Sequence, residues 1–190
     1  KIVAALAVLA VSPLQAQDSR LQARLPGEVA SQVQQLVDSA AQNGLPTEPL
    51  IQKALEGQSK GADGVRIIAA VRTLTGQLGD ARTALGPGSP EADIVAGAAC
   101  LKAGATPAMI TELRRLRPEQ SVAVPLGVLS DLVALGVEVP KAWDEVHSLA
   151  AAHGPDTDFL ALRDRVSAPN GKKPPGPAQP KLVPSTNSPP

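Results

Sequence analysis

The chain has 190 residues and carries 18 basic and 18 acidic side chains, so its formal net charge is zero at pH 7. With no basic field and only one Trp and one Phe for stacking, it lacks the features that nucleic-acid binding uses, and we expect no nucleic acid as a partner. Hydrophobic residues make up 43% of the chain and must build an aliphatic core, which favours packed helices over strands.

Residues 1–16 have the pattern of a secretory signal peptide. Lys1 precedes an apolar run that ends at Val11, and Leu14-Gln15-Ala16 matches a signal-peptidase site followed by polar residues. The run is too short to cross a bilayer. We therefore expect an exported bacterial protein, periplasmic or secreted, with no stable membrane insertion after the signal is removed.

Two helices are expected next along the chain. Residues 28–43 place apolar side chains on one helical face, and Gly44 follows at the position of a left-handed C-cap. Thr47 can cap the second helix, and Gly57 and Gly61 mark its end.

The longest helix is predicted from its N-cap Asp63 to Leu85. Its apolar residues recur at alternating steps of four and three, the pattern of a seam that packs against other helices. Gly76 and Gly79 each weaken the helix by up to about 1 kcal/mol relative to Ala, and we expect them to let a neighbouring helix approach closely. The expected buried stripe consists of Ile67, Val71, Leu74 and Leu78.

Proline marks the starts of the helices that follow. Ser89-Pro90-Glu91 and Thr106-Pro107 each pair a capping hydroxyl with a proline at the first helical position. The remaining expected starts are Pro125, Pro140 and a cap at Asp156 or Asp158, with the last helix running through Val166.

A glycine followed shortly by a proline recurs at Gly44 with Pro46, at Gly104 with Pro107 and at Gly136 with Pro140. The glycines are 60 and 32 residues apart, close to two units and one unit of the period that a helix pair has in helical repeats. Any chain of short helices also stops at glycine and starts at proline, so both arrangements stay open. The sequence predicts an all-α domain of about eight helices over residues 28–166, either an irregular bundle or a short α-solenoid.

The segments on either side of this domain differ in composition. Residues 17–27 are expected to form a linker. Residues 167–190 are rich in proline, and Leu182 and Val183 are their only sizeable apolar residues. Such a segment cannot bury enough surface to offset the entropy of ordering, so we expect a disordered tail with polyproline II character.

Candidate functional residues are few. Arg114, Arg115 and Arg117 form a basic cluster that we take as the candidate interaction surface for an acidic partner, the alternative being a solvated helix face. Asp144 and His147 stand one helical turn apart and are the residues that a small hydrolase or a metal site would use, although such a pair is commonly a solvated surface pair.

No cofactor, metal or nucleophile motif is evident. Cys100 is the only cysteine, which rules out a disulfide within the chain, and its apolar neighbours predict a small buried side chain. Residues 57–61, GQSKG, have the letters of GxSxG, but they follow a predicted helix and not a strand, so they are not the strand-to-helix turn that carries a nucleophile. No phosphate-binding loop is present in the required order. We therefore expect no cofactor and no catalytic residue.

Residues 44–61 read GLPTEPLIQKALEGQSKG, a pattern of the form GLPxxPLxxKxxEGxxKG. With the residues that follow as far as Val71, this stretch resembles exported bacterial helical proteins of uncharacterised activity. The resemblance implies a bacterial cell-envelope setting and carries no activity, cofactor or functional residue.

These observations favour a protein-interaction or scaffold module of the bacterial cell envelope, with envelope proteins as partners, over an enzyme. The alternatives are a small periplasmic hydrolase and a passive envelope spacer.

Export should remove residues 1–16 and leave Gln17 as the new N-terminus, because the apolar run is long enough for targeting and too short to stay in the bilayer. N-terminal sequencing of the exported protein checks this expectation. Recovery of the intact chain from the inner membrane would contradict it.

Overall fold

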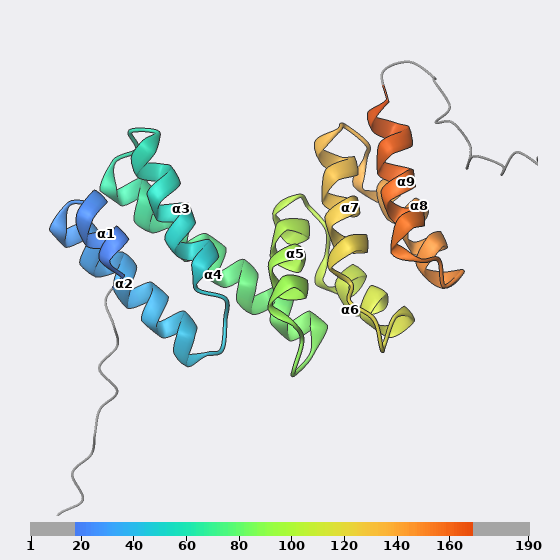
Figure 1. Cartoon of the computed structure of the whole chain (residues 1–190), viewed down its shortest axis with the longest axis horizontal. Helices are drawn as coiled ribbons and strands as arrows, with labels where there is room; N and C mark the ends of the chain where they lie inside the picture. The colour runs from blue at the N-terminus through green and yellow to red at the C-terminus, as the bar shows by residue number, and fades with distance from the viewer. Residues whose placement is uncertain (1–17, 169–190) are drawn as a thin grey trace, which may run out of the picture.

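The computed structural model describes residues 18–168, and this range contains only helices, turns and bends, which confirms the all-α class (Figure 1). The expected signal segment lies outside the described residues, as does the expected tail beyond Ala168. Nine helices are formed in the described range: α1 (Ser19–Arg24), α2 (Gly27–Gln42), α3 (Glu48–Ser59), α4 (Gly64–Leu85), α5 (Glu91–Lys102), α6 (Pro107–Leu116), α7 (Ala123–Ala134), α8 (Val139–Ala151) and α9 (Asp156–Ser167).

Helix α1 lies in the segment that was expected to be a linker. The Asp18 carboxylate caps it by accepting a hydrogen bond from the Arg20 N–H at 2.8 Å. Leu21 is fully buried, and Arg20 forms an ion pair with Glu48 of α3 at 2.7 Å. A helix of six residues is too short to show an apolar period, which explains why the pattern of the sequence did not indicate it.

Helices α2 and α3 pack on α4, α1 packs on α2 and α3, and the remaining helices continue from the second half of α4 (Figure 1). From there the helices form two rows. Helices α5, α7 and α9 are neighbours in one row, and α4, α6 and α8 in the other. The helices of the first row begin at Glu91, Ala123 and Asp156, which are 32 and 33 residues apart. Residues 64–167 therefore have the stacked arrangement of a short α-solenoid.

Two of the three glycines of the predicted repeat end equivalent helices of this stack, and the third, Gly44, follows α2 outside it. Gly104 and Gly136 have φ values of 101° and 90°, a left-handed conformation that favours glycine. At both sites the next residue donates a hydrogen bond back into the helix, from Ala105 N to the Cys100 carbonyl and from Val137 N to the Leu132 carbonyl, each at 3.0 Å.

Two of the predicted caps are confirmed. The Asp63 carboxylate accepts from the Arg66 N–H at 2.8 Å, and the Thr106 hydroxyl accepts from the Met109 N–H at 3.4 Å. The prediction for Thr47 is wrong, because its side chain makes no capping hydrogen bond.

Other predicted helix starts are corrected. Ser89 does not cap α5: its hydroxyl donates to the Gly86 carbonyl at 2.9 Å, and Pro90 is the N-cap residue. Helix α7 starts two residues before Pro125, which fits in the first turn because its missing N–H is not needed there. Asp156 lies in the first turn of α9 and does not cap it.

The buried stripe of α4 is confirmed in part. Ile67, Val71 and Leu78 are buried, whereas Leu74 is half-buried. Leu74 is left partly exposed because it lies in the space between Lys53 and Glu56 of α3 and Lys102 of α5.

The close helix approach expected at Gly76 and Gly79 occurs elsewhere. No described atom outside their own stretch of helix lies within 4 Å of where a Cβ would be at either glycine. Tight contacts occur instead at Gly57 against Ile67, at Gly64 against Val29 and at Gly97 of α5, where a Cβ would lie 2.9 Å from the Ala81 Cβ of α4. The smallness of Gly97 therefore sets how closely α5 packs on α4.

Replacing these glycines with alanine should have opposite effects. Gly76→Ala should raise the free energy of unfolding by about 0.5–1 kcal/mol, because Ala costs less entropy in a helix and has open space here. Gly97→Ala should lower it by about 1–3 kcal/mol, because α5 must move away from α4. Urea denaturation measures both values, and a loss of stability in Gly76→Ala would show that this helix is packed differently.

Candidate functional site

The three clustered arginines do not form a surface. Arg117 is buried and Arg114 is partly buried, while Arg115 alone is well exposed and pairs with Glu112 at 2.7 Å. Each of the two inward arginines holds a connection between helices. The candidate interaction surface at this cluster is therefore corrected to a structural network with one exposed member.

Arg114 meets a fully buried carboxylate of α5, Asp93, at 3.5 Å. This carboxylate also accepts hydrogen bonds from the Ser121 hydroxyl at 2.5 Å, the Val122 N–H at 3.2 Å and the Ala123 N–H at 3.1 Å. Helix α7 has no capping side chain at its own N-cap residue. Asp93 thus satisfies, from another helix, two of the N–H groups that are left free at the start of α7.

The remaining hydrogen bonds of Arg114 hold the loop between α6 and α7 in place. Its guanidinium donates to the Arg117 and Gln120 carbonyls. Arg117 is the C-cap residue of α6. Its carbonyl has no hydrogen-bond partner within that helix, because the helix ends there. A single arginine therefore joins the end of α6, the following loop and the buried carboxylate of α5.

Arg117 extends this network to the last helix. It donates to the Gly154 carbonyl at 2.8 Å and to the Asp156 carboxylate at 2.6 Å, and its guanidinium lies 5.2 Å from the centre of the Phe159 ring. Phe159 is itself fully buried. Asp156, which we expected as a helix cap, serves as the partner of this arginine.

The Asp144 and His147 pair does not form a catalytic arrangement among the described residues. His147 Nε2 lies 3.4 Å from Glu112 Oε1, and its ring centre lies 5.1 Å from that of Trp143. The Asp144 side chain makes no hydrogen bond to a described residue. Neither member of the pair lines the three hollows described below.

Cys100 is fully buried, as its apolar neighbours predicted. Its thiol lies 3.0 Å from the Leu126 carbonyl oxygen, to which it donates, and 3.4 Å from the Ser130 hydroxyl. Burial raises the pKa of the thiol to about 11, so the nucleophilic thiolate is scarce at neutral pH.

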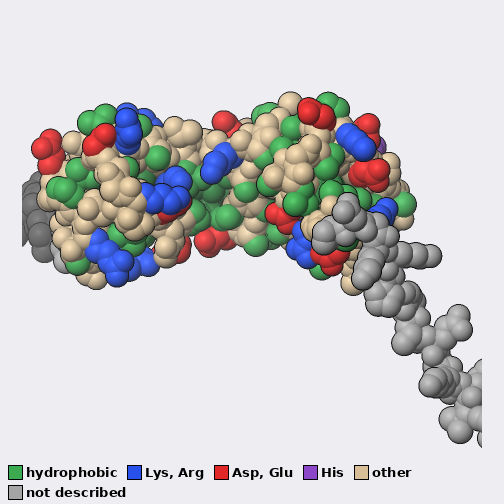
Figure 2. Space-filling model, turned by 90° about the horizontal axis from the view of Figure 1, so that it is seen from above, with side chains coloured by type: hydrophobic (Ala, Val, Ile, Leu, Met, Phe, Trp, Pro, Cys, Tyr) green, Lys and Arg blue, Asp and Glu red, His purple; other side chains and the backbone are tan. Residues whose placement is uncertain are grey.

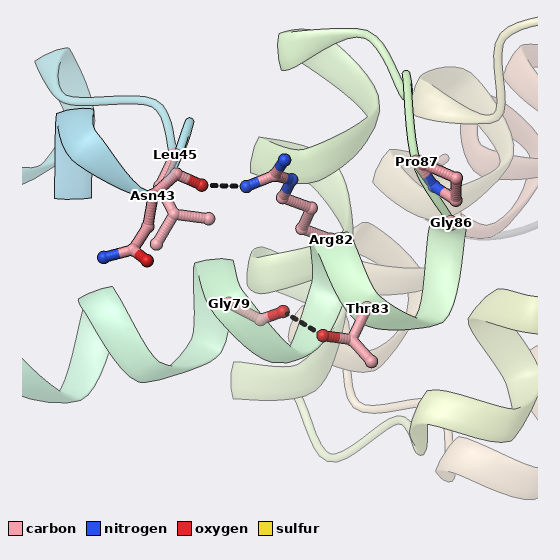
Figure 3. A pocket seen from close by; sticks show the side chains of 7 residues that line it. All are labelled: Asn43, Leu45, Gly79, Arg82, Thr83, Gly86 and Pro87. Atoms are coloured by element: carbon pink, nitrogen blue, oxygen red, sulfur yellow. Dashed lines mark hydrogen bonds between the residues drawn. The ribbon is translucent and has the colours of Figure 1, made fainter.

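Two of the hollows flank the loop between α2 and α3. In the first, of about 430 Å³, Arg82 of α4 donates to the Asn43 carbonyl and Thr83 donates to the Gly79 carbonyl at 2.9 Å (Figure 3). The polar groups of this hollow are hydrogen-bonded to each other, and the bond from Arg82 to the Asn43 carbonyl connects α4 to the end of α2. The second hollow lies between the same loop and the start of α5, and two carboxylates line it: Glu48, which is paired with Arg20, and Glu91.

The third hollow, about 390 Å³ in volume, is a groove between α3 and α5 that crosses the middle of α4. We call it the α3–α5 groove. Ala70, Leu74 and Gln77 lie at helical spacing on one face of α4 and form its floor. Its full lining comprises Lys53, Glu56, Ala70, Thr73, Leu74, Gln77 and Lys102.

Charged side chains form the rim of this groove. Lys53 binds Glu56 at 2.9 Å, and Lys60 binds the other oxygen of the same carboxylate. Lys60 and Lys53 together lower the pKa of Glu56 to about 2, so this carboxylate stays ionised at neutral pH. Lys102 rises from the other side, at the end of α5, and makes no ion pair within residues 18–168.

Figure 2 shows the molecule from above, with hydrophobic side chains exposed at its narrower middle and basic side chains beside them. The sequence did not indicate the groove, because its lining comes from three helices that approach only in the fold.

Within the part of the chain that the structure describes, no three His, Cys, Asp or Glu side chains lie close enough to hold a metal ion. None of the described helices has both the length and the apolar character needed to cross a membrane. Comparisons with protein-family models, with curated proteins and with solved structures found no match.

Removing either anchor of the buried network should destabilise the fold. Asp93→Ala should lower the free energy of unfolding by about 3–5 kcal/mol, because it leaves the buried Val122 N–H without its acceptor and Arg114 without its carboxylate. Arg117→Ala should cost less, about 1–3 kcal/mol, because its partner Asp156 is half exposed to water.

Arg115→Ala is the matched control, since it removes an arginine of the same cluster whose ion pair is solvated. We expect it to unfold at the same urea concentration as the unmodified protein. Equal losses of stability in the Arg115 and Arg117 variants would contradict the assignment of separate roles within the cluster.

Proposed function

We propose that the protein is an exported, non-enzymatic module of the bacterial cell envelope that binds a partner protein through the α3–α5 groove. The observation that carries this proposal is the half-exposed Leu74, an aliphatic side chain on the floor of a groove with charged sides. Binding sites commonly combine an apolar floor with a few polar groups at the edge.

The groove also has the mechanical support that a binding site needs. Its floor belongs to the longest helix, and its walls are helices that pack on that helix. Leu78, one turn after the floor residue Leu74, is fully buried, which holds the floor in place. Sites on packed helices need less ordering on binding than sites on loops, so less of the interaction energy is lost.

The signal pattern of residues 1–16 and the resemblance of residues 44–61 to exported bacterial proteins support the envelope location. The proposal of an interaction module is favoured over a hydrolase because Asp144 and His147 line none of the three hollows and the Cys100 thiol is buried. It is favoured over a passive spacer because a spacer does not require an exposed apolar floor flanked by lysines.

Thr73→Glu tests this proposal by placing a bulky charge in the groove. Thr83→Glu is the matched control, because both threonines are exposed on α4 and both donate to the carbonyl four residues earlier, at 3.0 and 2.9 Å. Thr83 does not line the groove. Circular dichroism and melting curves would first establish that both variants fold.

The three proteins would then be used as bait for solubilised native envelope proteins, with quantification by mass spectrometry. We expect partners that the unmodified protein and Thr83→Glu retain and that Thr73→Glu loses at least tenfold, a loss of about 1.4 kcal/mol in binding free energy. Equal retention by both variants would place binding outside the groove and refute the proposal.

A further inference from the structure

We propose that the α3–α5 groove binds an acidic polypeptide segment that carries an aliphatic side chain. This inference rests on the proposed function and names the chemistry of the partner. The floor and the rim of the groove each select one property of the ligand.

The floor selects the aliphatic side chain. Leu74 and Ala70 of α4 are only partly covered by their own fold, so they leave apolar surface in contact with water. A ligand side chain placed over Leu74 removes water from both surfaces, which is favourable. The volume of about 390 Å³ holds a few side chains and no folded domain, which points to a segment of a partner.

The rim selects negative charge. Among the lining residues, Lys53 and Lys102 bring two ammonium groups and Glu56 brings one carboxylate, and Lys60 binds that carboxylate from outside the groove. Glu56 is shared by two of these lysines, at the α3 side. Lys102, which is exposed on the α5 side and has no ion-pair partner in the described range, is left to meet a carboxylate of the ligand.

The chain's own C-terminal segment does not have this chemistry. Residues 167–190 contain three lysines and no aspartate or glutamate, so their charge has the same sign as the excess at the groove. Like charges at a binding surface oppose association. The occupant we infer is therefore an acidic segment of another protein.

A synthetic peptide in which leucines recur at helical spacing among glutamates provides the probe. Two matched peptides replace the glutamates with lysines or the leucines with serines. Titration followed by NMR should show saturable binding of the first peptide, with shifts of amides around Leu74 and Lys102, and at least tenfold weaker binding of the other two. Equal binding of the lysine peptide, or no saturable binding of the glutamate peptide, would overturn the inference.

Lys102→Glu should weaken binding of the glutamate peptide roughly tenfold, since it turns an attraction into a repulsion. Lys141→Glu is the control with the same change of charge. Lys141 is exposed on α8, makes no ion pair in residues 18–168 and does not line the groove. Equal weakening by both variants would show attraction to overall charge and would overturn the inference.

The two proposals can fail separately. If Thr73→Glu loses native partners that Lys102→Glu retains in full, the groove is the binding site but its ligand is not acidic. If Thr73→Glu and Thr83→Glu retain the same partners, the groove is not the site. Self-association that Thr73→Glu abolishes would identify a second copy of this chain as the occupant and would also overturn the inference of an acidic partner segment.

Discussion

The buried carboxylate of Asp93 is the contact on which the second half of the molecule depends. It lies in α5, yet it accepts hydrogen bonds from the first N–H groups of α7 and faces the guanidinium of Arg114 from α6. A buried carboxylate is costly unless several donors surround it. Here those donors come from three consecutive segments, so satisfying one charge fixes the relative positions of α5, α6 and α7. Arg117 then carries the same network to α9 through Asp156.

This arrangement decides where a partner can bind. Because Arg114 and Arg117 are used inside the fold, the most basic stretch of the sequence does not supply a basic surface. The surface that remains available arises from the length of α4, whose ends are covered by different helices. Its middle is left partly open at Leu74, between Lys53 and Lys102. The same helix therefore joins the two halves of the described chain and provides the floor of the proposed binding site.

Local features of the fold were predictable from the sequence, and long-range ones were not. The cap at Asp63 and the repeated stops at Gly104 and Gly136 depend on neighbouring residues, so their patterns were sufficient. The burial of Arg117 depends on a carboxylate 39 residues further along the chain, which adjacency in sequence cannot reveal. The exposure of Leu74 also could not be predicted from the sequence. Leu74 continues a regular apolar seam, and it is half-buried because of where the other helices pack. For that reason the sequence does not predict the α3–α5 groove.

Hydrogen exchange at the start of α7 tests the role of Asp93 most directly. We predict slow exchange of the Val122 amide in the unmodified protein, because it is buried and donates to this carboxylate. In Asp93→Ala its exchange should be at least tenfold faster, roughly the effect of 1.4 kcal/mol, while the Leu45 amide in the other half keeps its rate. Unchanged exchange at Val122 in this variant would contradict the claim that Asp93 organises the second half.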